Sequence, residues 1–256
     1  QSNDAVDNTA GECLYYRGEL VKDAVYHSSN GGATEDSANV FGGDPGYLIG
    51  KPDPNEARIT IPNYSYSVTY SADELTWILE QKGYSIGTVQ NVYISEYTPM
   101  GNVKKVTFEG SRGSTTVSGD TCRTVFYSST YNKSVRSLRF DINGSSAGTG
   151  GSVYVSGGGQ LTSLNGAFVI SGGGNMGTLS GDSASVISSS GISAVSGGGG
   201  TISRPSAGSS NGSFTITGTG NGHNVGMSQY GARSMAEQGY DYQDILEFYY
   251  TDITIR

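Results

Sequence analysis

Apolar and polar residues alternate with a period of two in several parts of the chain, as they do in half-buried β-strands. The first of these parts turns back around Arg17-Gly18 and predicts a β-hairpin. Three later parts follow one another with turn residues between them and predict an antiparallel meander. The hairpin is predicted over 11–26, the meander over 89–97, 103–109 and 114–117, and single strands over 64–70 and 135–142.

Helical spacing replaces this alternation in four shorter segments. Ser71 and Glu74 form a capping box ahead of the first, and Gly83 ends it. Gly239 fits the C-terminal stop of the third segment, and Asp241 can cap the fourth. The predicted helices cover 72–82, 119–126, 227–238 and 242–250. The apolar positions at helical spacing in the last two are Met227, Ala232, Met235, Ala236, Ile245, Leu246 and Tyr249.

Half of the glycines lie in one span of the chain. Of 40 glycines, 20 fall between 143 and 212, where Asp182 and Arg204 are the only charged residues. Short β-branched stretches and glycine turns repeat there about every 15 to 18 residues, which predicts β-hairpins. A flexible Gly/Ser linker is the alternative, although linkers rarely place Val, Ile, Leu and Phe in alternation.

The pattern as a whole predicts an α+β fold, mainly antiparallel β with a few short helices. With 35% hydrophobic residues, the chain can bury at least one sizeable core. We expect one domain made of 1–142 and 213–256, interrupted by a Gly/Ser-rich hairpin wing at 143–212.

Charge narrows the partners that the chain can bind. The net charge of −8 and the pI near 4.7 argue against nucleic acid, which is bound through clustered Lys and Arg. No apolar run approaches the roughly 20 residues that span a bilayer. The N-terminal residues lack the basic start and apolar run of a signal peptide, so we expect either that a signal was removed or that the sequence is a fragment.

The densest polar motif is GTGNGHNVGMSQYGARSMAEQGYDYQDILEFYY at 218–250. Its glycines carry His223, one of two histidines, into a helix start, where backbone N–H groups lack helical partners. This geometry is typical of a loop that faces a ligand. A second motif, HSSNGGATE at 27–35, joins the other histidine to hydroxyl and amide groups, a glycine pair and a carboxylate.

These two motifs resemble signatures of the stage II sporulation protein D and amidase enhancer family. The first has that family's order G-x-G-H-x-V-G-M-S-Q-Y-G-A followed by G-Y-x-Y-x-x-I-L, and the second has Y-H-S-S-x-G-G-x-T-E. The tract A-V-D-x-T-x-G and an S-G-x-x-x-R segment also resemble the family. The family usually has Gly where this chain has Asn224, a residue that tolerates a left-handed backbone better than most.

The resemblance implies a protein that acts on bacterial peptidoglycan. Sporulation members resemble lytic transglycosylases, in which a glutamic acid protonates the glycosidic oxygen between N-acetylmuramic acid and N-acetylglucosamine and an anhydro ring forms. In the family this acid lies upstream of the A-V-D-x-T-x-G tract, which begins here at Ala5, so we expect it to lie outside this sequence. Glu35 is the resident candidate, although a structural role for its carboxylate is favoured.

The remaining polar residues of the two motifs are candidates for holding sugar hydroxyl and N-acetyl groups. Each also has a structural alternative: a histidine at a strand end can bond a carbonyl, and Tyr230 and Met227 can pack in the core. The predicted substrate-binding residues are His27, Ser28, Ser29, Gly31, Gly32, His223, Ser228, Gln229 and Tyr230.

Other chemistries find less support. A zinc centre would require His27, His223, Cys13 and Cys122 to meet in space, so neither a metal nor a cofactor is predicted. The two cysteines can form a disulfide or remain as buried thiols. The pattern G-x-S-x-G occurs at 83–87, 144–148 and 208–212, but at none of these places does it lie between a predicted strand and a predicted helix, as it does in a serine hydrolase. The G-x-G patterns of the wing likewise lack the context of a nucleotide fold.

Three kinds of function therefore remain. The first is the glycan-holding part of a lytic transglycosylase. The second is a non-catalytic amidase enhancer that binds peptidoglycan glycan strands and acts with a partner amidase. The third is a purely structural surface protein. For the first two we expect an extracellular, wall-associated protein of a Gram-positive bacterium, secreted or anchored to the membrane through a segment outside this sequence.

Overall fold

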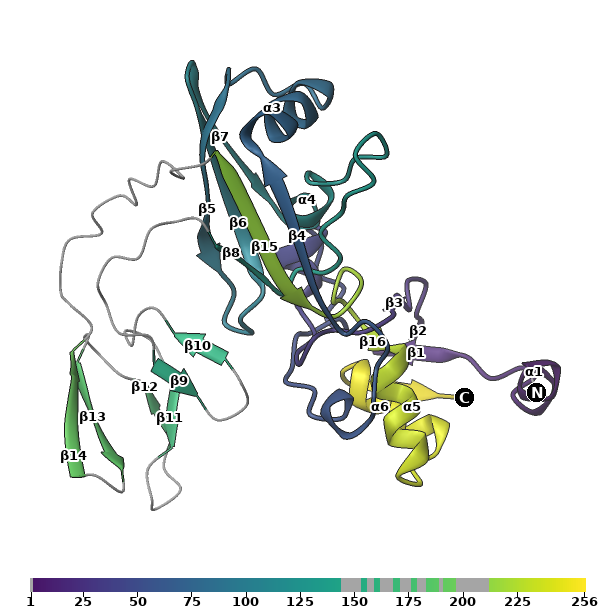
Figure 1. Ribbon diagram of the computed structural model, residues 1–256. Helices are drawn as coiled ribbons and strands as arrows, with labels where there is room; N and C mark the ends of the chain where they lie inside the picture. Colours follow the sequence, from purple (N-terminus) through teal and green to yellow (C-terminus); the bar gives the residue numbers. More distant parts are fainter. Residues whose placement is uncertain are drawn as a thin grey trace. The chain divides into compact units, whose positions relative to one another are not determined.

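The computed structural model describes residues 2–143 and 212–256 and, between these ranges, the backbone of six short strands (Figure 1). The chain divides into two compact units. Unit 1 consists of Gln1–Ser145 and Gly208–Arg256, and unit 2 of Ser146–Ala207.

Three antiparallel sheets of three strands each form the framework of unit 1. The first has the order β17-β1-β2, so that the last strand of the chain pairs with the predicted N-terminal hairpin. The second has the order β4-β15-β8, and the third is the predicted meander β5-β6-β7. These strands are β1 (Leu14–Tyr16), β2 (Glu19–Leu20), β4 (Ser65–Ser71), β5 (Val89–Tyr97), β6 (Val103–Gly110), β7 (Gly113–Ser118), β8 (Phe140–Asn143), β15 (Ser213–Thr219) and β17 (Ile253–Ile255).

A fourth, two-stranded sheet is parallel. It joins β3 (Tyr26–His27) to β16 (Met227–Ser228), which lie in the two motifs singled out from the sequence. Parallel pairing requires a long connection between the strands, and here nearly the whole chain supplies it.

The helices are short and lie at the ends of the sheets. The predicted capping box of Ser71 with Glu74 is present, and Asp241, predicted as a cap, forms a second capping box with Asp244. The helices are α1 (Ser2–Asn8), α2 (Ser37–Val40), α3 (Ala72–Gln81), α4 (Thr121–Thr124), α5 (Gln229–Glu237) and α6 (Tyr242–Tyr249), with a 3₁₀ turn at Glu56–Arg58. The sequence patterns did not predict α1, α2 or the 3₁₀ turn.

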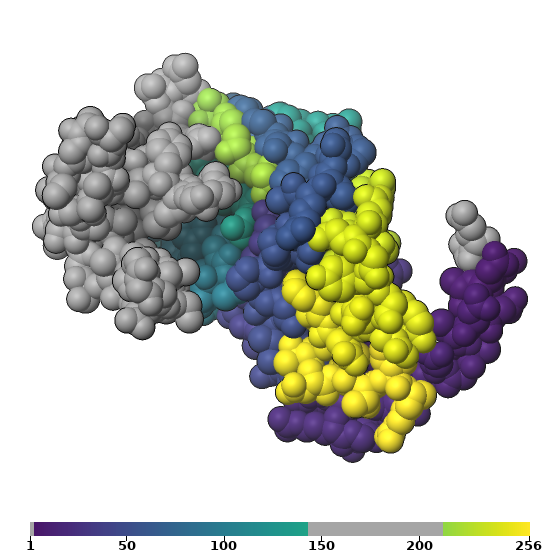
Figure 2. Space-filling model, turned by 90° about the horizontal axis from the view of Figure 1, so that it is seen from below, coloured from purple at the N-terminus to yellow at the C-terminus, as the bar shows by residue number. Residues whose placement is uncertain are grey.

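Part of the core of unit 1 is a cluster of aromatic rings from β4, β6, β8 and the residues that follow α4. Phe126 contacts three of these rings, Tyr70, Phe108 and Phe140, at centroid distances of 5.6, 5.4 and 6.2 Å. Tyr70 also donates a 2.9 Å hydrogen bond to the carbonyl of Phe126, which satisfies its buried hydroxyl. In Figure 2 the yellow C-terminal residues lie against blue and purple residues of the N-terminal part, in agreement with the β1–β17 pairing.

The described strands of unit 2 pair as three two-stranded antiparallel hairpins, the kind of element that the repeats in its sequence predicted. Their strands are β9 (Val153–Val155) with β10 (Gly159–Leu161), β11 (Phe168–Ile170) with β12 (Met176–Thr178), and β13 (Ser183–Ser188) with β14 (Gly191–Ser196). The predicted wing, 143–212, also includes connecting residues that lie outside the described part of the chain.

Three element predictions need correction. The strand expected over 135–142 forms only at β8, because the preceding backbone bonds to several segments: the Arg136 carbonyl accepts from Gly222 and the Leu138 carbonyl from Val103. The helix expected from residue 227 begins at Gln229, because Met227–Ser228 pairs with β3 instead. The helix expected over 119–126 is limited to α4, with turns on either side.

The fold class is confirmed: unit 1 is α+β and mainly antiparallel. Cys13 is exposed, Cys122 is buried, and both are free thiols, so the disulfide alternative does not occur in this structure. Among the described helices, none is long and apolar enough to cross a membrane.

Candidate functional site

The structure brings the two sequence motifs together. We call 26–35 the N-terminal signature, 218–230 the C-terminal signature, and their contact the signature junction. Besides the β3–β16 pair, Ser29 and Asn221 exchange two backbone hydrogen bonds of 3.1 and 2.7 Å. The Glu35 N–H donates to the Asn224 carbonyl at 2.8 Å. Segments 196 residues apart (223 − 27) are thus joined through their backbones.

Glycines make this close approach possible. A Cβ at Gly222 would lie 2.5 Å from the Cβ of His27, and one at Gly226 would overlap the carbonyl oxygen of Val25. Both glycines have positive φ angles, 135° and 70°. A side chain at either position would therefore force the signatures apart and strain the backbone.

Asn224 occupies a left-handed backbone position at the centre of the junction. Its φ is 64° and its side chain is fully buried. The side-chain amide donates to the Asn30 carbonyl at 2.8 Å and to Asn102 Oδ1 at 3.2 Å. Asn224 therefore adopts the left-handed backbone that the sequence led us to expect it to tolerate.

Two buried carboxylates accept hydrogen bonds from the N-terminal signature. Neither was singled out from the sequence. Glu56 accepts the backbone N–H groups of Asn30 and Gly31 at 2.6 and 3.0 Å, and it also accepts the hydroxyl of Ser228. Its side chain is 2% exposed, and this burial raises the pKa of the Glu56 carboxyl. Glu56 therefore connects both signatures to the segment between β3 and β4.

Asp53 extends this support to the C-terminal helix. It accepts the side-chain amide of Asn30 at 2.7 Å and the hydroxyl of Tyr249 at 2.6 Å. Burial and the neighbouring Asp53 carboxylate raise the pKa of Tyr249, which keeps its hydroxyl a donor. Asp53 and Glu56 lie in a Gly/Pro-rich connection at 41–62 that has no hydrophobic periodicity, so only their residue types could have identified them.

Glu35, the resident candidate acid, has a fully occupied carboxylate. It accepts from the Asp36 N–H and the Asn39 amide through Oε1, and from Thr98 and Asn102 through Oε2. Its side chain is 1% exposed. This is the structural role that the sequence analysis favoured for it, because the bonds fix the end of the N-terminal signature.

The two histidines meet edge to face, with ring centroids 5.6 Å apart. His27 Nδ1 donates to the Val225 carbonyl at 3.0 Å, and the Val225 N–H donates to His223 Nδ1 at 3.1 Å. Burial lowers the pKa of His27 to about 3 and also lowers the pKa of His223. Both imidazoles are therefore neutral near pH 7.

The predicted substrate-binding residues fall into two groups by exposure. His27, Ser29 and Ser228 are buried and bond to protein groups, so their contribution is to position the junction. The residues that reach the surface are Ser28, Gly31, Gly32, His223, Gln229 and Tyr230. Substrate binding by any of them stays a prediction. Within the described residues, no group of three His, Cys, Asp or Glu side chains is arranged to hold a metal ion.

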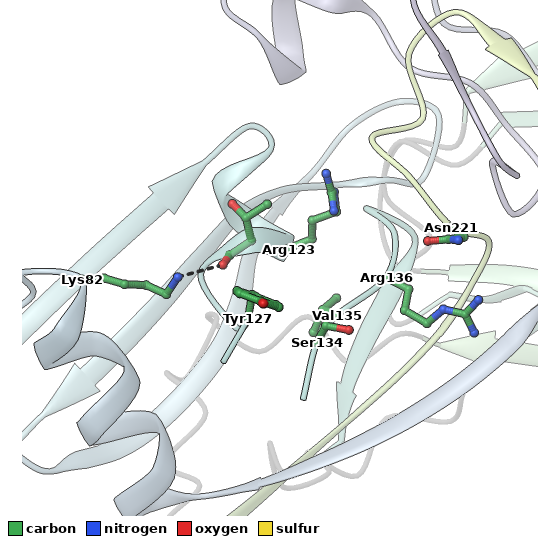
Figure 3. Close-up of a pocket in the computed structure, with 8 residues that line it drawn as sticks. Lys82, Arg123, Tyr127, Ser134, Val135, Arg136 and Asn221 are labelled. Carbon is green, nitrogen blue, oxygen red and sulfur yellow. Dashed lines mark hydrogen bonds between the residues drawn. The ribbon is translucent and has the colours of Figure 1, made fainter. Parts of the chain in front are cut away.

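A pocket of about 420 Å³ lies beside the C-terminal signature (Figure 3). Asn221 is its one lining residue from either signature. The others come from the end of α3 and from the segment that contains α4 and leads to β8. The lining residues are Lys82, Arg123, Thr124, Tyr127, Ser134, Val135, Arg136 and Asn221.

The fold and the junction define a class of α+β protein in which a His-Ser-Gly loop is joined to a Gly-His loop at a helix start. The chain is 29% identical over 269 aligned residues to the amidase enhancer of Bacillus subtilis (strain 168), a match that covers 99% of this chain and 32% of that protein. It is 57% identical over 44 residues to the stage II sporulation protein D of Bacillus amyloliquefaciens, covering 17% of this chain and 13% of the relative.

The stage II sporulation protein D of Bacillus subtilis (strain 168) matches at 54% identity over 37 residues, 14% of this chain and 11% of the relative. No protein-family model matches the chain. These similarities confirm the resemblance to the stage II sporulation protein D and amidase enhancer family that the motifs indicate. The chain spans about a third of the amidase enhancer's length and a smaller share of the other two relatives.

Proposed function

We propose that this chain is a non-catalytic, wall-binding module of the amidase enhancer type, which holds peptidoglycan glycan strands while a partner amidase acts on them. The similarity to the amidase enhancer, which extends over 99% of the chain, supports this choice. The module works outside the cell, at the wall, as the resemblance implies.

The observation that carries the proposal is that the carboxylates at the junction are buried and already accept hydrogen bonds from protein groups. Glu35, Asp53 and Glu56 are each at most 2% exposed, and each accepts hydrogen bonds from the loops around it. A general acid must reach within hydrogen-bond distance of the glycosidic oxygen. These carboxylates instead fix the backbone of the two signatures, which suits a preformed binding surface.

A lytic transglycosylase is the second candidate. The partial similarity to two stage II sporulation proteins D favours it, because sporulation members of the family resemble lytic transglycosylases. On this alternative the chain would hold the glycan, and an acid other than the buried Glu35, Asp53 and Glu56 would protonate the glycosidic oxygen. The surface-reaching residues of the junction would contact the sugar in both cases.

The proposal is tested by digesting purified peptidoglycan with a wall amidase in the presence and absence of the chain. We expect faster release of stem peptides with the chain present. Gln229→Ala removes an exposed polar group at the junction, so it should weaken the enhancement by about threefold to tenfold, the value of one or two hydrogen bonds. Gln243→Ala, also exposed but on α6, is the matched control and should leave the enhancement unchanged.

Mass spectrometry of the same digests separates the two candidates. The chain without amidase should release no anhydro-muropeptides. Their release by the chain alone would overturn the non-catalytic proposal in favour of the transglycosylase, and an absence of enhancement with wall binding intact would overturn the partnership with an amidase.

A further inference from the structure

The pocket beside the C-terminal signature has a charge opposite to that of the chain. Three of its eight lining residues, Lys82, Arg123 and Arg136, are cations, and none is Asp or Glu. The whole chain has 15 Lys and Arg against 23 Asp and Glu. An acidic protein that gathers cations around a cavity offers a local site for an anion.

The three cations differ in how they are engaged. Arg123 forms a two-pronged ion pair with Asp120, with donor–acceptor distances of 2.7 and 3.0 Å. Lys82 and Arg136 donate to backbone carbonyls instead, those of Thr124 at 3.2 Å and Asn63 at 2.9 Å. A backbone carbonyl leaves the charge of a cation uncompensated, so these two side chains can each attract a carboxylate.

Between these two cations the lining residues are uncharged, apart from Arg123 in its ion pair with Asp120. In the view of Figure 3, Lys82 and Arg136 lie on opposite sides of Tyr127, Ser134 and Val135. Tyr127 is 58% exposed and presents a ring, while Ser134 and Asn221 provide hydroxyl and amide groups. Two positive ends separated by neutral, hydrogen-bonding surface match a ligand with two separated negative groups. A single phosphate, in contrast, is best held where several donors converge on one point.

We propose that this pocket binds a short peptide with free carboxylates, the carboxylates lying toward Lys82 and Arg136 and the peptide backbone against Tyr127, Ser134 and Asn221. If the proposed function holds, the natural source of this peptide is the stem attached to the wall glycan, since Asn221 joins the pocket to the signature junction. The chain would then hold the part of the polymer that contains the amidase's target bond.

The test is a titration of the chain with acetyl-Glu-Ala, which has two free carboxylates, followed by nuclear magnetic resonance of the backbone amides. We expect shifts at Tyr127, Ser134 and Asn221, and weaker binding at higher salt concentration because the charges are partly exposed. Amidation of both carboxylates should reduce the affinity by at least about tenfold. Equal binding of the amidated peptide, or equally effective competition by inorganic phosphate at constant ionic strength, overturns the proposal.

Variants locate the site. Lys82→Gln and Arg136→Gln should each weaken acetyl-Glu-Ala binding by about fivefold, the effect of one partly exposed ion pair. Lys22→Gln changes an exposed lysine outside the pocket lining and should have no effect. Arg136→Lys keeps the charge if removal of the guanidinium disturbs the fold, and it should retain most of the affinity. Unchanged binding in both charge-removing variants also overturns the proposal.

The titration involves no amidase, so its outcome is independent of the proposed function. Peptide binding without amidase enhancement would contradict the proposed enhancer role but not the pocket assignment. Amidase enhancement without peptide binding would contradict the pocket assignment but not the enhancer role. Wall material with and without peptide stems gives a third readout: pelleting with the wall should decrease when the stems are removed.

Discussion

Single glycines decide whether the two signatures can touch. At Gly226 the backbone has φ of 70° and an added Cβ would overlap the Val25 carbonyl. Gly42 has a similar φ of 79°, but an added Cβ would meet nothing within 4 Å. These two positions therefore separate the cost of backbone strain from the cost of a steric clash.

We expect Gly42→Ala to destabilise the protein by about 1 to 2 kcal/mol, the cost of a left-handed L-residue. Gly226→Ala should cost about 1 to 3 kcal/mol more, because the methyl group must displace the backbone at Val25, the residue before the N-terminal signature. Urea unfolding of both variants measures the difference. Equal losses would show that the junction yields easily at this point.

His27 makes the stability depend on pH in a defined direction. Its pKa is about 3 in the folded protein, against about 6.5 in an unfolded chain. Between these values the unfolded state binds more protons. The stabilisation is therefore complete above pH 6.5 and is lost as the pH falls, at up to about 1.4 kcal/mol per pH unit.

Urea unfolding of the wild type and of His27→Gln at pH 6.5 and pH 4.5 tests this expectation. Glutamine keeps an N–H donor for the Val225 carbonyl but does not titrate. The wild type should lose about 2 to 3 kcal/mol more than the variant over this range. Parallel losses would assign the acid sensitivity to other groups, His223 among them.

The sequence predicted some residues of the junction and missed others for a physical reason. The signatures at 26–35 and 218–230 stand out because glycines and polar residues are concentrated there, and Asn224 was expected to tolerate a left-handed backbone. Asp53 and Glu56 lie in a connection without periodicity. Their burial depends on Asn30, Ser228 and Tyr249, which are distant in the chain.

At the scale of elements, the two C-terminal helices begin with caps of different importance. Ser228 caps α5, since its hydroxyl oxygen accepts the Gly231 N–H at 3.0 Å, and the same hydroxyl donates to buried Glu56. Asp241 caps α6 in an exposed capping box. Only the first cap therefore also supports the site.

Asp241→Ala should cost about 1 kcal/mol, the usual value of an N-cap. Ser228→Ala should cost about 2 to 4 kcal/mol, because it removes a cap and also leaves a buried carboxyl without one of its donors. Thermal or urea unfolding measures both losses. A similar loss in the two variants would mean that water or a neighbouring group replaces the serine at Glu56.

Elements with local signals were predicted well, and those fixed by distant partners were not. The helix at Ala72–Gln81 has its capping box, and the strands of the meander have alternation and turns. Residues 135–139 have the alternation of a strand, yet their backbone groups bond to Val103 and Gly222. No local pattern records such partners.

At the scale of the whole molecule, the two strands on either side of the long insertion, β8 and β15, pair within unit 1. These strands are antiparallel neighbours, with Asn143 directly opposite Thr215. The two ends of the insertion therefore leave unit 1 from adjacent strands, and a short linker can connect them.

Replacing 146–207 by a linker of about six Gly and Ser residues should change the free energy of unfolding of unit 1 by less than about 1 kcal/mol, because loop length contributes only logarithmically. Amide spectra of the shortened and full chains should agree for 2–140 and 220–256. Loss of cooperative unfolding in the shortened chain would show that the insertion stabilises unit 1.

The β3–β16 pair also sets an order of events during synthesis. His27 emerges from the ribosome 201 residues before its partner Ser228 (228 − 27). Closing so long a loop is among the slowest steps of folding. A chain that ends between these two residues therefore leaves β3 without its partner strand, and an unpaired strand edge favours aggregation.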